Sequence, residues 1–128
     1  MARPFLGGEL TLHEFSLAVR LIEAIGQKAE EVGAVKVSLV KLRVGLATTV
    51  VPQFLSEAFN VAKLGTIAED AELEIETDPI KLICWNCGAE FEADNFFAEC
   101  QSCGGIGGKV ISGDQIVIER VEFEVKQQ

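Results

Sequence analysis

The pattern of apolar and polar residues predicts two amphipathic helices in the first half of the chain. In the first helix, Thr11 is the expected N-cap, Glu14 is its expected capping-box partner, and Gly33 is the expected stop. The second helix is expected to begin at Pro52 and to end at Gly65. Apolar residues at three- and four-residue spacing form the stripes expected to be buried, namely Phe15, Ala18, Val19, Ile22, Ile25, Ala29 and Val32, then Leu55, Ala58, Phe59 and Ala62.

Alternating patterns predict three strands. Residues 35–44 alternate first in one phase and then in the opposite phase, which indicates a bulge or a strand that is buried on both faces. Residues 71–77 alternate apolar side chains with Glu72, Glu74 and Glu76, which is typical of a half-solvated strand. Residues 116–125 form the third expected strand.

These elements predict an α/β fold in which two helices pack on a three-stranded sheet. The last strand has no helix of its own, so we expect it to join the sheet of the first two strands and to leave residues 80–113 as an insertion. The expected organisation is a flexible leader at residues 1–11, an α/β domain at residues 12–79 and 114–128, and a cysteine module at residues 80–113.

All four cysteines of the chain lie in this module, in the pattern C-x2-C-x12-C-x2-C. Cys84 and Cys87 form one C-x-x-C pair, and Cys100 and Cys103 form the other. Four thiolates suit tetrahedral Zn²⁺ and leave no open coordination position, which predicts a zinc ribbon with a structural metal. Iron in a rubredoxin-like site is the alternative metal. Free or disulfide-bonded cysteines are the alternative without a metal.

The module also holds several aromatic residues. Phe91, Phe96 and Phe97 are expected to pack under the ribbon. The alternative is a platform on which the bases of a nucleic acid stack, and it is disfavoured because the module has no basic face for the phosphates. Trp85 lies between the two cysteines of the first pair. We favour packing beside the ribbon for Trp85 and keep a partner contact as the alternative.

Composition and charge narrow the class of function. The 128 residues include 20 acidic and 11 basic ones, so the formal net charge is −9. This charge opposes binding to nucleic acid or to an anionic membrane. Without a secretory signal or an apolar run long enough to span a bilayer, we expect a cytoplasmic protein. No nucleophile–base pair or phosphate loop is present in the sequence, so no enzymatic activity is predicted.

The single histidine, His13, lies beside Glu14 at the start of the first predicted helix. One histidine excludes any site that needs two imidazoles from one chain. From composition alone, a surface histidine without a metal is the more frequent case.

The first predicted helix opens with the motif Leu12-His13-Glu14-Phe15-Ser16-Leu17-Ala18. This motif resembles the Met-His-Glu-x-Ser-x-Ala opening of the HypA/HybF family of nickel metallochaperones, which mature [NiFe]-hydrogenases and, in some bacteria, urease. The resemblance continues in the same order to residue 125, through Val44-Gly45, Val50-Val51-Pro52, Ala58-Phe59, Gly65-Thr66, Ala71-Glu72-Leu73-Glu74-Ile75, both C-x-x-C pairs and Ile111-Ser112-Gly113.

The resemblance implies a nickel-binding α/β domain interrupted by a zinc ribbon. It also implies Ni²⁺ as cargo at His13 and Glu14, Zn²⁺ at the four cysteines, and the initiator amine of the family as a further nickel ligand. In this sequence Leu12 stands at the initiator position, and its nitrogen is an amide to Thr11. The implied partners are a HypB-type GTPase, expected on the exposed face of the first helix, and a hydrogenase large subunit that receives the nickel.

Two other functions compete with nickel delivery. The first is a zinc-ribbon adaptor that scaffolds the maturation partners without binding nickel itself. The second is a ribbon that binds nucleic acid, which the net charge of −9 disfavours.

Overall fold

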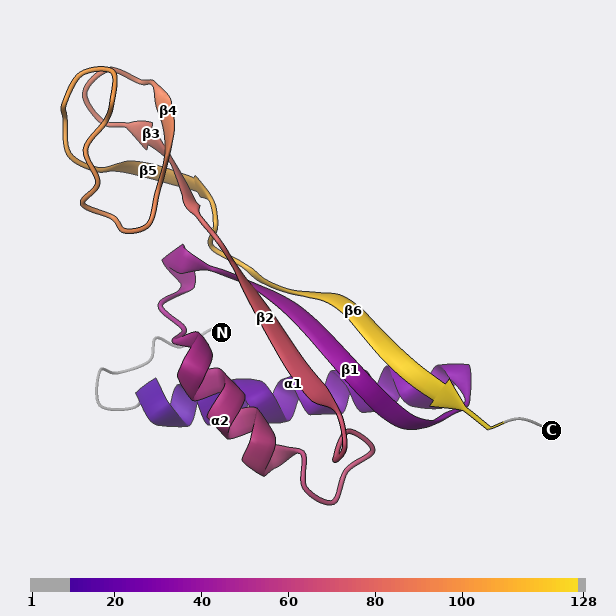
Figure 1. The fold of residues 1–128 in the computed structure, drawn as a ribbon. Helices are drawn as coiled ribbons and strands as arrows, with labels where there is room; N and C mark the ends of the chain where they lie inside the picture. Colours follow the sequence, from indigo (N-terminus) through magenta and orange to yellow (C-terminus); the bar gives the residue numbers. More distant parts are fainter. Residues whose placement is uncertain (1–9, 127–128) are drawn as a thin grey trace. The chain divides into compact units, whose positions relative to one another are not determined.

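The computed structural model describes the backbone of residues 10–126 (Figure 1). It describes the side chains from Glu14 onward. Helix α1 spans Leu10–Val32 and helix α2 spans Pro52–Ala62. A three-stranded sheet has the order β2-β1-β6, with β1 at Ala34–Gly45, β2 at Glu72–Asp78 and β6 at Ile116–Val125. A second sheet has the order β4-β3-β5, with β3 at Ile80–Cys84, β4 at Glu90–Ala93 and β5 at Gly108–Ser112. A 3-10 turn, η2, covers Leu46–Thr48. The predicted α/β fold with an inserted ribbon is confirmed.

The chain forms two compact units. The helical unit comprises the residues up to 41, residues 50–74 and the residues from 118 onward, and the cysteine unit comprises residues 42–49 and 75–117. The predicted domain boundaries at residues 79–80 and 113–114 stay a prediction. Neither helix within residues 10–126 has the length and apolarity that crossing a membrane requires.

The start of α1 differs from the prediction. The helix already includes Leu10 and Thr11, so Thr11 is not its N-cap, and the predicted leader is wrong for these two residues. Residues 1–9 of that leader lie outside the described residues. At the other end the prediction is confirmed, because Gly33 follows the helix with a φ of 73°, which glycine adopts without strain.

The buried side of α1 is rotated slightly from the predicted stripe. Ala18, Leu21, Ile22, Ile25 and Ala29 are buried in the helical unit, whereas Phe15 and Val32 are exposed. A helix repeats every 3.6 residues, so a stripe drawn at fixed spacing drifts towards solvent at its ends. Leu21 was missed for the same reason, because it lies one position from the predicted line.

Strand β1 and helix α2 follow the sequence pattern closely. In β1 the buried positions change phase after Val37 and continue at Val40, Leu42 and Val44, as the alternation predicts. Pro52 is the first residue of α2, and Leu55 and Phe59 are its buried residues. The helix ends at Ala62, three residues before the predicted stop at Gly65.

The cysteine unit has a small apolar core. Ile80 and Leu82 of β3 lie opposite Ala93 and Phe91 of β4, and Leu82 also pairs with Val110 of β5. The buried members of this cluster are Ile80, Leu82 and Ala93. Such a core is too small to supply much folding free energy on its own.

The aromatic residues of the unit divide into packed and exposed ones. Phe91 is partly buried against the apolar core, as predicted. Trp85 is 72% exposed and Phe97 is 80% exposed, and Phe96 is exposed as well. The prediction that these three side chains pack with the ribbon is therefore wrong.

Candidate metal sites

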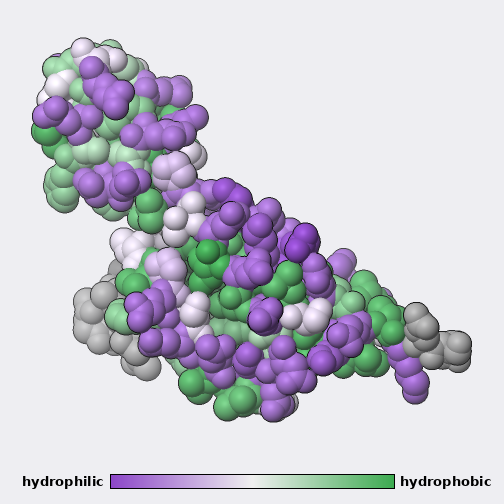
Figure 2. Space-filling view, in the orientation of Figure 1, coloured by the Kyte–Doolittle hydropathy of each residue, from purple (hydrophilic) through white to green (hydrophobic). Residues whose placement is uncertain are grey.

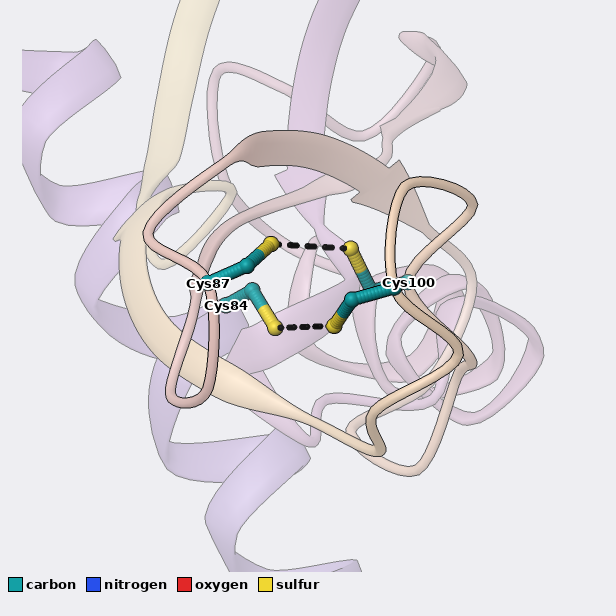
Figure 3. Close-up of side chains that lie close together, drawn as sticks. Cys84, Cys87 and Cys100 are labelled. Atoms are coloured by element: carbon teal, nitrogen blue, oxygen red, sulfur yellow. Dashed lines mark hydrogen bonds between the residues drawn. The ribbon is translucent and has the colours of Figure 1, made fainter.

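The four cysteines lie together at one end of the small sheet. Cys84 is the last residue of β3, Cys87 follows in a turn, and Cys100 and Cys103 come from the segment between β4 and β5. Their sulfur atoms all lie within 4.8 Å of one another. The Sγ atoms of Cys84 and Cys103 are 3.6 Å apart, and those of Cys87 and Cys100 are 3.7 Å apart (Figure 3). These distances fit a tetrahedral ion with metal–sulfur bonds of about 2.3 Å, whose sulfur atoms are about 3.8 Å apart.

Each pair of cysteines is held by the same local turn. The N–H of Gly88 donates to the Cys84 carbonyl at 3.0 Å, and the N–H of Gly104 donates to the Cys100 carbonyl at 2.8 Å. Both glycines have a φ of 79°, a conformation that other residues adopt only with strain. The repeated turn directs both thiols of a pair towards the same point.

Hydrogen bonds to sulfur favour the thiolate that a metal binds. The Asn86 side chain donates to the Sγ of Cys103 at 3.4 Å, and the N–H of Gly105 donates to the same atom at 3.3 Å. These two bonds are the main reason that the pKa of Cys103 is lowered to about 6. A lowered pKa favours the thiolate form of Cys103, whereas hydrogen bonds to neighbouring cysteines and desolvation raise the pKa of Cys87.

Asn86 and Gly105 are site residues that sequence reasoning missed. A Cβ at Gly105 would lie 3.2 Å from the Sγ of Cys103, so glycine keeps this side of the site open. Their positions, inside one C-x-x-C pair and just after the other, are the only signal of this role in the sequence. All four cysteines are free, so the disulfide alternative is wrong.

Glu14 occupies an unusual position in the helical unit. Its side chain is 1% exposed, and its Oε2 accepts a hydrogen bond from the N–H of Val51 at 3.0 Å. Val51 is the N-cap residue of α2, so this bond joins the first turns of α1 to the start of α2. The predicted capping-box role of Glu14 is wrong, because this carboxylate binds a residue far along the chain.

The second oxygen of this carboxylate, Oε1, is buried and has no hydrogen-bond partner among the residues that the structure describes. Buried polar atoms are usually paired, so this oxygen has the capacity to accept a further bond. His13 precedes Glu14 in the first turn of α1, and its side chain lies outside the described part of the structure. The grouping of His13 and Glu14 in one metal site therefore stays a prediction.

The bond from Val51 to Glu14 leads to a stability prediction. Glu14→Ala should lower the free energy of unfolding by about 1–3 kcal/mol, because it removes the hydrogen bond that the buried Glu14 carboxylate accepts from the N–H of Val51. Glu14→Gln retains an acceptor oxygen and should lose less than half as much. Urea unfolding of both variants measures the difference. Equal losses in the two variants would show that the hydrogen bond contributes nothing.

Comparison with known proteins places these features in a family. Residues 12–123 match the family model HypA, described as hydrogenase/urease nickel incorporation, metallochaperone. The hydrogenase maturation factor HypA of Aquifex aeolicus is 37% identical over 114 residues, which cover 89% of this chain and 99% of the relative. The factor of the same name from Chlorobium luteolum is 33% identical over 110 residues, with 86% and 94% covered.

Two solved structures have a similar fold. The solution structure of the Ni metallochaperone HypA from Helicobacter pylori superposes with a TM-score of 0.63 at 20% identity, covering 88% of this chain and 98% of the other. A second structure, titled as the solution structure of HypA protein, gives 0.64 at 21% identity, with 90% and 98% covered. At this identity the likeness extends to the fold alone.

Proposed function

We propose the function of this chain on the basis of its family, because the chain belongs to the HypA family of hydrogenase/urease nickel incorporation metallochaperones. It is a nickel metallochaperone for hydrogenase maturation. The observation that carries this conclusion is the family match over residues 12–123, which includes both the α/β elements and the four cysteines. The alternative of an adaptor that binds no nickel has no comparable support.

The nickel cargo is held at the start of α1, with His13 and Glu14 as side-chain ligands. The buried Oε1 of Glu14 supports this assignment, because an incoming cation would give that oxygen its missing partner. The imidazole of His13 and nearby backbone nitrogens supply the nitrogen ligands that suit planar Ni²⁺. Affinity for nickel should then fall at acid pH as these ligands take up protons.

The four cysteines hold Zn²⁺ in a structural site. The Sγ distances of 3.6 and 3.7 Å support zinc, since they are close to those of a tetrahedral site with four thiolates. Such a site has no open position for water or substrate, so the metal stabilises the fold and takes no part in transfer.

The partners are a HypB-type GTPase and the large subunit of a hydrogenase, which accepts the nickel. The exposed face of α1 supports the first, because charged residues such as Glu23, Lys28, Glu30 and Glu31 are exposed along it. The absence of disulfide bonds among the four cysteines supports a cytoplasmic location, where thiols stay reduced and available to metal.

Removing the residues before the family motif tests nickel binding and its chemistry together. A variant that lacks residues 1–11 and carries Leu12→Met has a free amine beside His13, with a pKa of about 8. An amine binds nickel more readily than an amide, which must first lose a much less acidic proton. Both forms, loaded with zinc beforehand, should bind Ni²⁺ in a calorimetric titration, the shortened form about tenfold more tightly.

The two forms should also differ in colour. Planar nitrogen ligation gives the shortened form a d–d absorption band that is weaker or displaced in the full chain. Zinc content is the control, and it should be equal because the cysteines lie far along the chain. Absence of nickel binding in both forms would refute the proposed function, and equal affinity would refute only the role of the amine.

A further inference from the structure

The cysteine unit exposes a group of large apolar side chains. Trp85 is 72% exposed, Phe97 is 80% exposed, Ile106 is 56% exposed, and Phe96 is also exposed. We call these four residues the aromatic patch. Folded proteins seldom leave such side chains together in water without a use, and tryptophan and phenylalanine are common anchors of protein interfaces.

Three segments bring the patch together. A Cβ placed on Gly107 would lie 3.9 Å from two atoms of the Trp85 ring and 3.1 Å from the Phe96 carbonyl oxygen. Ile106, the neighbour of Gly107, forms a β-bridge with Glu99, and the N–H of Gly107 donates to the Ala98 carbonyl at 3.0 Å. The indole of Trp85 therefore lies beside the segments that carry Phe96, Phe97 and Ile106.

The backbone under the patch is firmly held. Trp85 lies between Cys84 and Cys87 in the first C-x-x-C turn, and Ile106 lies three residues after Cys103, the end of the second C-x-x-C turn. The N–H of Phe97 donates to the Oδ1 of Asn95 at 2.8 Å, which fixes the turn that carries Phe96 and Phe97. A patch built on ordered turns loses little entropy on binding, which favours affinity.

Acidic side chains are exposed in the same unit as the patch, where hydrophilic and hydrophobic residues mix at the surface (Figure 2). Glu90, Glu92, Asp94 and Glu99 are exposed in the same unit, and Asp94 and Glu99 flank the segment that holds Phe96 and Phe97. Lys109 is the exposed cation of residues 80–113. A zinc ion held by four thiolates would add further negative charge, because the thiolates outnumber the two charges of the ion.

We propose that the aromatic patch docks a protein segment in which apolar side chains alternate with lysine or arginine. The apolar side chains would cover Trp85, Phe97 and Ile106, and the basic ones would face the exposed carboxylates of Asp94 and Glu99. The same charges disfavour the other occupants, because a second copy of this chain would bring another net charge of −9, and nucleic acids and anionic membranes repel an acidic face. This inference is independent of nickel binding, and its test uses no nickel.

Trp85 provides the signal for the experiment, because it is the single tryptophan of the chain. The zinc-loaded protein is titrated with three synthetic peptides without aromatic residues, in which Lys alternates with Leu, Glu with Leu, or Lys with Ser. The Lys–Leu peptide should shift the emission to shorter wavelength and saturate, as the indole leaves water. The Glu–Leu and Lys–Ser peptides should bind at least about tenfold more weakly, because each lacks one of the two chemistries.

Variants locate the binding on the patch. Phe97→Ala and Ile106→Ala should each weaken binding of the Lys–Leu peptide by about tenfold, as loss of an interface anchor does. The matched control is Leu64→Ala, since Leu64 is 62% exposed in the helical unit and should leave the affinity unchanged. Equal zinc content in all proteins shows that the ribbon is folded in each variant.

Several results would overturn the proposal. Equal binding of the Glu–Leu peptide would remove the argument from charge. Equal affinity in the Phe97→Ala, Ile106→Ala and Leu64→Ala proteins would show that the peptide binds elsewhere. A saturable shift with single-stranded oligothymidylate, or self-association that Phe97→Ala abolishes, would identify a nucleic acid or a second copy as the occupant instead.

Discussion

Cys84→Ala should release the zinc and unfold residues 80–113 while α1 and α2 stay helical. The variant leaves three thiolates, which bind zinc far more weakly than four. Zinc contributes about 10–16 kcal/mol of binding free energy to small zinc-finger peptides, more than this unit gains from the buried residues Ile80, Leu82 and Ala93. The helical unit has its own core around Ile25, Leu55 and Phe59 and should keep its fold.

Two measurements check this result. Native mass spectrometry should show one zinc per chain in the unaltered protein and none in the variant. Amide hydrogen exchange should become fast in β3, β4 and β5 and stay slow in α1. Ser102→Ala is a matched control, because Ser102 is exposed between Cys100 and Cys103 and should leave both readouts unchanged. A zinc-free Cys84→Ala protein with a protected ribbon would refute the structural role of the metal.

The regular elements and the cysteine site were predictable from the sequence because their signals are local. Alternation located the three strands of the first sheet, and the phase change in β1 appears as the shift of burial from Val37 to Val40. The spacing of the four cysteines was sufficient to predict their cluster, since each turn of C-x-x-C type has one favoured geometry.

The features that were mispredicted depend on contacts between distant residues. The pattern from Thr11 to Glu14 matches a capping box, but the carboxylate of Glu14 binds the N–H of Val51, 37 residues away. A rule based on neighbouring residues cannot decide between a capping partner in the same helix and the distant N–H of Val51. Trp85 and Phe97 were expected to pack with the ribbon, and only the fold shows that both side chains lie outside its small core.

His13→Ala should abolish tight nickel binding and leave the fold intact. His13 is the single imidazole of the chain, so no other residue replaces the ligand. Loss of a direct ligand should weaken nickel binding by on the order of a hundredfold or more, since even the loss of an outer partner of a ligand costs about 10–100-fold. The residue lies in the first turn of α1, where backbone N–H groups have no partner within the helix. The free energy of unfolding should therefore change by less than about 0.5 kcal/mol.

The nickel measurement must separate the start of α1 from the cysteines, because thiolates also bind Ni²⁺. Zinc is therefore loaded first, and its content is measured again after the nickel titration. Ser16→Ala is the matched control, since Ser16 is exposed one turn further along α1 and should keep full affinity. If the zinc-loaded His13→Ala protein binds nickel as tightly as the unaltered chain, the cargo is held by other residues. In that case the buried carboxylate of Glu14 stabilises the fold without binding nickel, and the assignment of nickel to the start of α1 is wrong.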